Sequence, residues 1–386
     1  MKLYSHIKKI PEDFVVEEVP ALKVVSEGAF DVFILKKRNV STLEAVRIIS
    51  KLLKFSLKSI GFAGLKDKYA VTTQYITVPS GKITEEKLSF YNDGRWRVGK
   101  RQSNSSFEIK FIGKSKKPLT IGNIYGNKFT IKIRNFEKSM REKFYRNLQT
   151  VKLYGFPNYF GEQRFGSVKS RDDFVLRYIL KGDFVKALKV YFLGKEKIDM
   201  LTDWQNIYKV LKPTLEEYEK DLLRGLLKGL PAEKAFRILP KNIRVMFNFA
   251  FQSYLFNRIL GEYILNKYSY RQVPFINNWK LYFYLEVPDF EYFKNLQIPY
   301  TGKNLPPEDS LLKKVMKKVF KEEKVTPSVF DMEIAGMKVM TDGQRKAVVI
   351  PENFKIVSKT KKDVTIQFIL PPGSYATILL RALLSV

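Results

Sequence analysis

The end of the chain most constrains how it can fold, because it carries one strand and one helix and no core of its own. Residues 363–370, DVTIQFIL, place an apolar side chain at every second position, as a half-buried strand does. Pro371-Pro372-Gly373 then breaks the strand, and Ser374 can cap a final helix. Two elements cannot bury a stable core, so we expect residues 345–386 to join a sheet formed elsewhere in the chain.

The beginning of the chain has the strands that such a sheet needs. In residues 129–134, FTIKIR, apolar and polar side chains alternate. Ser41 and Glu44 form a capping box before an amphipathic helix. The pattern predicts strands at 14–19, 29–36, 72–78 and 129–134 and helices at 42–54 and 139–153, which is an α+β arrangement.

The middle of the chain differs from both ends. Residues 170–270 repeat apolar side chains every three to four positions, which predicts helices. Residues 271–340 are mixed and Pro-rich, with no clear periodicity. A sheet-forming start, a helical middle and a sheet-forming end indicate one domain interrupted by another. Two or three sequential domains are the alternative.

The charge of the chain points to a polyanionic partner. Its 386 residues include 69 Lys and Arg against 39 Asp and Glu, a formal net charge of +30. Nucleic acid fits this excess best, because aromatic residues that can stack on bases make up 14% of the chain. A basic but merely solvated surface is the alternative. No basic amphipathic helix stands out as a membrane anchor.

The residue types that are missing exclude several kinds of chemistry. There is no cysteine, so disulfides, thiolate nucleophiles and cysteine-based zinc sites are excluded. The only histidine, His6, is expected at the surface and cannot by itself supply a catalytic triad. No Walker A or dinucleotide-binding pattern occurs, so no cofactor is indicated. The charged N-terminus lacks a secretory apolar segment, which predicts an intracellular, cytoplasmic protein.

One stretch combines glycine with an isolated acid. In residues 61–74, GFAGLKDKYAVTTQ, Asp67 lies between Lys66 and Lys68 in a glycine-punctuated segment that leads into a strand. A chance arrangement of an ordinary loop is the simple interpretation. A carboxylate set among cations is the other, because nearby positive charge favours the ionised form.

Five motifs in order resemble one enzyme family. They are PEDFVVEE (11–18), GFAGLKDKYAVTTQ (61–74), GNIYGNKFTIKIR (122–134), PNYFGEQRFG (157–166) and LPPGSYATILLRAL (370–383). Together they resemble the TruD family of tRNA pseudouridine synthases, and AFQSYLFNRIL (250–260) is similar to its archaeal and eukaryotic branch, which suggests an archaeal-like member.

The resemblance implies a fold and a reaction. The implied catalytic domain is α+β with a mixed, largely antiparallel sheet, at residues 1–165 and 341–386, interrupted by a mainly helical α+β insertion at 166–340. The implied reaction isomerises uridine to pseudouridine in tRNA, typically at position 13; related eukaryotic enzymes accept other RNA sites. It needs no cofactor or metal, and nothing in the sequence demands a protein partner, an oligomer or a membrane.

The resemblance also assigns the two catalytic candidates. Asp67 matches the family's catalytic aspartate, which can attack C1′ of the ribose or remove a proton from the sugar; the sequence does not choose between these routes. Arg381, on the last helix, stands where pseudouridine synthases carry a basic residue that pairs with this aspartate. An arginine fork would orient the carboxylate. A solvated C-terminal arginine is the alternative.

The remaining candidates surround a uridine that must be flipped out of the tRNA stack. Phe129 is expected to stack on the base, with plain core packing as the alternative. Asn127 could bond the uracil edge or simply be a turn residue. Phe14 and Tyr375 match positions that line the uridine site, although ordinary packing would also explain both. Lys66 is expected to bind substrate by holding phosphates, or else to help keep Asp67 ionised, and Gln74 and Arg164 are expected to support the site and to contact phosphate.

Two other functions would also explain much of the sequence. A non-catalytic RNA-binding protein or RNA chaperone accounts for the charge and the aromatics, but not for Asp67, Arg381 and Phe129 occurring together. An aspartate-dependent N-glycosidase acting on nucleic acid shares the chemistry at C1′ but releases free base.

The segment PNYFGEQRFG (157–166) has two glycines among aromatic residues. We expect it to form the hinge to an insertion domain that helps to grip tRNA.

Overall fold

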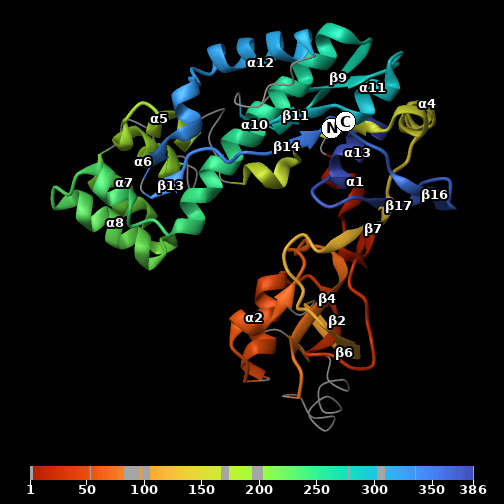
Figure 1. Ribbon diagram of the computed structural model, residues 1–386, viewed down its shortest axis with the longest axis horizontal. Coiled ribbons are helices and arrows are strands. Elements are labelled where there is room, and N and C mark those ends of the chain that lie inside the picture. The colour runs from red at the N-terminus through yellow and green to blue at the C-terminus, as the bar shows by residue number, and fades with distance from the viewer. Residues whose placement is uncertain are drawn as a thin grey trace. The chain divides into compact units, whose positions relative to one another are not determined.

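The chain forms two compact units. The computed structural model describes residues 3–52, 54–81, 96–97, 105–166, 174–193, 203–276, 279–301, 309–334 and 336–385 (Figure 1). The sheet unit comprises Met1–Lys152, Val349–Ala376 and Leu383–Val386, and the helical unit comprises Leu153–Val348 and Thr377–Ala382. These limits fall near the predicted domain limits at 165 and 341, and the domain assignment itself stays a prediction.

The sheet unit is built on one mixed sheet whose strands follow the order β16-β17-β7-β1-β4-β2-β6-β5, with β3 paired to β4. β1 and β4 run parallel, and the other pairs are antiparallel. The predicted tail strand indeed joins this sheet, as β17 beside β7. The strands are β1 (Phe14–Pro20), β2 (Phe30–Arg38), β3 (Gly61–Phe62), β4 (Val71–Pro79), β5 (Trp96–Arg97), β6 (Ser106–Ser115), β7 (Ile124–Ile133), β16 (Glu352–Lys359) and β17 (Val364–Leu370).

Alternation along these strands gives the sheet one apolar face. Opposite residues on paired strands point to the same side, so Val16, Phe129 and Phe368 share this face. Phe33 and Leu35 of β2 extend it and pack with Val46 and Ile49 of the helix α2 in a buried cluster. Burying this face provides the main stabilisation of the unit.

Two helices of the sheet unit, α2 and α4, show the caps that the sequence predicts. The Ser41 hydroxyl accepts the Glu44 N–H at 3.2 Å, one half of the predicted capping box. Gly155, with φ +65°, ends α4 in the left-handed conformation that glycine tolerates. His6 is 8% exposed, and its Nδ1–H donates to Arg134 O at 2.9 Å, so the surface position expected for it is wrong. The helices here are α1 (Tyr4–Ile7), α2 (Thr42–Leu52) and α4 (Lys138–Tyr154), with 3-10 turns at Pro11–Asp13 and Leu57–Ser59. Most of α13 (Ala376–Leu384) belongs to the helical unit, which includes Thr377–Ala382.

The helical unit confirms the helices predicted for residues 170–270, within the part of the chain that is described. Its long helix α10 lies beside α12 (Figure 1), and the apolar residues Leu312, Val315, Met316, Val319 and Phe320 of α12 are buried. No helix of the described ranges is long and apolar enough to cross a membrane. The helices are α5 (Val175–Ile179), α6 (Phe184–Leu193), α7 (Trp204–Leu211), α8 (Glu217–Leu227), α9 (Ala232–Phe236), α10 (Lys241–Lys267), α11 (Phe290–Asn295) and α12 (Ser310–Glu322), with 3-10 turns at Glu162–Phe165, Lys212–Thr214 and Pro327–Asp331.

The region without clear periodicity, 271–340, contains short paired strands around α11 and α12. β9 pairs with β10 and β12 with β13 in this region, β11 pairs with β14 just beyond it, and β8 pairs with β15 outside it. Strands this short leave little room for an alternating pattern, which explains the absence of a clear periodicity in this region. They are β8 (Phe156–Pro157), β9 (Tyr270–Pro274), β10 (Lys280–Tyr284), β11 (Gln297–Pro299), β12 (Glu333–Ile334), β13 (Met337–Lys338), β14 (Gln344–Lys346) and β15 (Val348–Val349).

Candidate functional site

Asp67 lies on a loop over the apolar face of the sheet. This segment, residues 63–70, is called the Asp67 loop; it connects β3 to β4. The Asp67 side chain is 21% exposed, and its Oδ1 lies 3.5 Å from the Nζ of Lys8. The same ammonium sits 3.9 Å from the ring centroid of Phe14. A carboxylate at the surface thus faces a cation that is itself held against an aromatic ring.

Polar side chains from the sheet reach up to the Asp67 loop. Lys37 of β2 is 1% exposed and donates from Nζ to the carbonyl oxygens of Val40 and Asp67, each at 2.8 Å. Burial lowers the pKa of Lys37 from 10.5 to about 8, and the Asp67 carboxylate acts in the opposite direction. The loop is therefore fixed through its main chain as well as through its side chains.

A buried ion pair holds the residue before Asp67. The Nζ of Lys66 lies 2.7 Å from Oε2 of Glu18, and these side chains are 6% and 0% exposed. Glu18 belongs to the apolar face of β1, where an unpaired carboxylate would be costly. Lys66 was predicted to contact substrate, but its ammonium is turned to the sheet. This geometry favours a role in supporting the loop.

A hydrogen-bond chain joins the loop to α2 and β4. The Thr42 hydroxyl donates to Gln74 Oε1 at 2.8 Å and accepts the Lys66 N–H at 3.0 Å. The Gln74 amide donates to the Gly64 carbonyl at 3.3 Å. Gln74 is 0% exposed, so its contacts fit the expected site support and leave no surface for RNA.

Aromatic rings continue from Lys8 along the sheet. Phe14 meets Phe129 edge to face at 6.0 Å, and Phe129 stacks on Phe368 at 5.5 Å. Phe14 and Phe129 are 2% and 7% exposed. One face of the Phe129 ring is therefore covered by protein, and its stacking on a base stays a prediction.

Asn127 has an unused hydrogen-bond acceptor. It lies in β7 opposite Glu18, so the alternative of a turn residue is wrong. Its Oδ1 is buried and has no hydrogen-bond partner among the described residues. Buried polar atoms without a partner are rare, so this acceptor calls for an explanation. Asn127 lies opposite Glu18 in the sheet, and Glu18 is paired with Lys66 of the Asp67 loop. Asn127 is also two residues before Phe129.

Tyr375 follows the turn that ends the tail strand. Gly373, with φ +80°, makes that turn, and Tyr375 is half-buried directly before α13. Its role at the uridine site stays a prediction.

Arg381 and Arg164 belong to the helical unit. Arg381 places Nε and Nη2 at 2.8 and 2.6 Å from Oε1 of Glu162, and Nη1 donates to the Pro274 carbonyl at 2.9 Å. The Arg164 guanidinium lies 4.7 Å from the Phe249 ring centroid, and its Nε donates to Ser253 at 3.2 Å. The Arg381 guanidinium thus forms an ion pair with Glu162. Its predicted pairing with Asp67 stays a prediction.

Three residues around Asp67 went unnoticed in the sequence: Lys8, Glu18 and Lys37. Lys8 and Lys37 are two of 69 basic residues, so neither stands out by type. Glu18 belongs to a quoted motif, PEDFVVEE, and the only available signal was its place on the apolar side of a strand. Lys37 likewise lies at a buried position of β2, and that position was the only signal that the sequence offered for it.

Comparison with known proteins identifies the family of this chain. The family model described as tRNA pseudouridine synthase D (TruD) matches residues 3–274 and 291–383. The tRNA pseudouridine synthase D of Aquifex aeolicus is 41% identical, over 98% of this chain and 97% of its own. A relative from Methanococcus vannielii, "Probable tRNA pseudouridine synthase D", is 33% identical, over 97% of this chain and 94% of its own.

A solved structure shows the same fold. The crystal structure from Methanosarcina mazei, given the same TruD description, superimposes with a TM-score of 0.68 at 25% identity, covering 99% of this chain and 93% of that one. The relatives from Methanocaldococcus jannaschii and Methanococcus vannielii match 98% and 97% of this chain at 28% and 33% identity, whereas the Aquifex aeolicus relative is 41% identical. The expected α+β fold and the expected family are confirmed, and the chain belongs to the TruD family of tRNA pseudouridine synthases, a family of isomerases.

Proposed function

We propose that this enzyme converts uridine 13 of tRNA to pseudouridine, using Asp67 and no cofactor, on a uridine flipped out of the stack. The observation that carries the proposal is the partly exposed Asp67 carboxylate, 3.5 Å from a lysine that is itself held on Phe14. As a tRNA-modifying enzyme, it is proposed to work in the cytoplasm.

The reaction needs little beyond what these residues offer. The C1′–N1 bond breaks, the uracil turns, a C1′–C5 bond forms, the C5 hydrogen leaves as a proton and N1 gains one. Asp67 either attacks C1′ or removes a proton from the sugar, and Lys8 orients its carboxylate for either role. The unused Oδ1 of Asn127 is an acceptor that suits the N3–H of uracil.

The proposal is tested by tritium release from tRNA transcripts that carry tritium at C5 of uracil. The wild-type enzyme is expected to release tritium, because isomerisation must expel the C5 hydrogen, and a transcript with cytidine in place of uridine 13 should release none. Release that persists undiminished from that transcript would contradict the assignment of position 13. Absence of release from every transcript would contradict the function.

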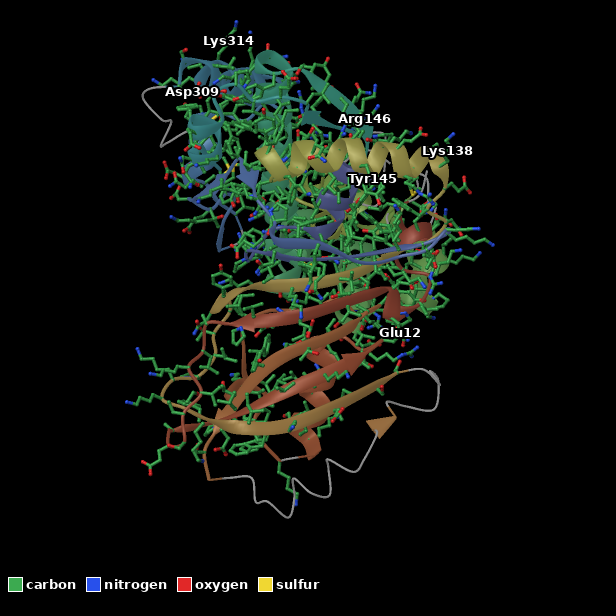
Figure 2. The ribbon with its side chains drawn as sticks, turned by 90° about the vertical axis from the view of Figure 1, so that its right-hand side faces the viewer. Glu12, Lys138, Tyr145, Arg146, Asp309 and Lys314 are labelled. Atoms are coloured by element: carbon green, nitrogen blue, oxygen red, sulfur yellow. The ribbon has the colours of Figure 1, made fainter. Side chains whose placement is uncertain are left out.

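The helical unit offers a surface for the tRNA backbone. Lys314, Lys317 and Lys321 lie on the solvent face of α12, at spacings of three and four residues that align side chains along one side of a helix. The Lys314 side chain points away from the ribbon (Figure 2). We define these three residues as the α12 lysine row and propose that it contacts phosphates, in line with the role expected of the insertion.

Replacing the α12 lysine row by glutamine is expected to weaken tRNA binding and to lower its salt dependence. Three lost phosphate contacts should reduce the slope of log K against log salt by about 2. Binding of tRNA is measured across a salt series. A matched variant with glutamine at the exposed Lys228, Lys234 and Lys241 removes the same charge elsewhere in the unit and should change the slope less. Equal slopes in the two variants would contradict a specific role for α12.

A further inference from the structure

Lys37 is a buried lysine whose hydrogen bonds go to the main chain at the site. Lysine is almost never fully buried unless it is paired, yet Lys37 is 1% exposed. Its ammonium has three N–H groups. They face the carbonyl oxygens of Val40 and Asp67 at 2.8 Å and that of Lys66 at 3.5 Å. The side chain thus ties the segment before α2 to the catalytic residue itself.

The positive charge of Lys37 does not favour folding. The pKa of Lys37 is lowered from 10.5 to about 8 in the folded chain, mainly by burial. The unfolded chain therefore binds more protons between these values, so stability rises with pH across that window. Below about pH 8 the folded chain with protonated Lys37 is therefore less stable than a neutral Lys37 would make it. A costly group that is kept beside a catalytic residue indicates a functional role.

The position of Lys37 suits a side chain that holds the main chain of the Asp67 loop in place. It projects from a central strand of the sheet, which is more rigid than the loop that it holds. It bonds the carbonyl of the residue whose carboxylate reacts, so a shift of that carbonyl would move the carboxylate. Misplacement by about 1 Å can cost a factor of about 100 in rate.

We propose that Lys37 is a positioning residue of the pseudouridine synthase reaction: its ammonium holds the main chain at Asp67 so that the carboxylate is presented to the ribose. The proposal rests on the function proposed above for Asp67.

The first test replaces Lys37 by methionine, which keeps the length of the side chain and removes its N–H donors. Single-turnover tritium release at saturating enzyme is expected to fall by about thirtyfold or more, with tRNA affinity within about twofold of wild type. Hydrogen exchange at the amides of residues 64–68 should become faster. Lys114→Met is the matched control: it removes a 2.6 Å ion pair with Asp31 from the same β2–β6 strand pair, and its release should stay within about threefold of wild type.

The second test uses the absence of cysteine from the chain. Lys37→Cys can be alkylated at one position only, in the unfolded protein, and then refolded. Treatment with 2-bromoethylamine restores an ammonium of lysine length and should recover tritium release. Treatment with 1-bromopropane gives an uncharged side chain of the same shape and should not.

The outcomes separate this proposal from the function on which it rests. Equal recovery with both reagents, or tritium release by Lys37→Met within about threefold of wild type, would overturn the role of Lys37. If wild type itself releases no tritium from any tRNA, the proposed function fails. Exchange at residues 64–68 then still decides whether Lys37 holds the loop, and unchanged exchange would overturn that as well.

Discussion

Tritium release from C5-labelled tRNA is expected to stop when Asp67 is replaced by asparagine, while tRNA stays bound. Asparagine has the shape of aspartate but carries no charge, so it can neither attack C1′ nor take a proton from the sugar. We expect a rate below about one-thousandth of wild type. The loop should keep its conformation, because Lys37 and Thr42 hold it through main-chain groups.

The structure provides a closely matched control for this variant. Asp363 is 22% exposed and lies 3.1 Å from Lys132, which resembles the exposure of Asp67 and its distance from Lys8. Asp363→Asn removes an equivalent carboxylate and ion pair from the sheet unit and should keep release within about threefold of wild type. Residual release by Asp67→Asn at the level of this control would show that Asp67 is not the reacting group.

The same samples separate the competing functions. A non-catalytic RNA-binding protein would bind tRNA in both variants and release no tritium with wild type. An N-glycosidase would release labelled uracil and leave an abasic site, whereas isomerisation leaves the mass of the tRNA unchanged. Product mass therefore distinguishes the two enzymes.

The sequence predicted those parts of the fold that depend on local pattern. β1 and β17 match their predicted ranges within one residue, because alternation with one buried face is a strong signal. β7 begins at Ile124, five residues before the predicted strand. The reason is Gly126: a Cβ there would lie 2.6 Å from the Leu370 carbonyl oxygen, so this glycine permits a close approach between strands and does not make a turn.

The site was only partly predictable, for a different physical reason. Asp67 stood out because an acid in a basic, glycine-punctuated segment is unusual and the family motif surrounds it. Its neighbours depend on tertiary contacts between residues far apart in the chain, such as Lys8 with Asp67 and Glu18 with Lys66. The pairing of Arg381 with Glu162 is of the same kind. No local pattern specifies which of many lysines and arginines meets a given carboxylate.

Lys8→Met is expected to lower the rate of tritium release by about a hundredfold with little effect on tRNA affinity. The Lys8 ammonium lies 3.5 Å from Asp67 Oδ1. Removing one preorganised polar group from an active site commonly lowers the rate by a factor of about 100 or more. Methionine keeps an apolar stem against the Phe14 ring, so packing is largely preserved. The Lys8 side chain is 10% exposed, which leaves it little access to phosphates. Single-turnover release and tRNA binding are measured on the same preparations.

The adjacent residue, Lys9, supplies a control that distinguishes an effect on the Asp67 carboxylate from an effect on tRNA binding. The Lys9 side chain is exposed, and the Tyr69 hydroxyl donates to the Lys9 main-chain carbonyl at 2.9 Å. Lys9→Met therefore removes the same charge one residue away and keeps this hydrogen bond. If Lys8 acts on the carboxylate, only Lys8→Met slows the reaction at saturating enzyme. If both variants lose affinity and both recover at saturation, Lys8 serves the tRNA backbone instead. Because Asp67 would then lack its assigned cation, the pairing predicted from sequence between Asp67 and Arg381 would become the stronger account of how the carboxylate is oriented.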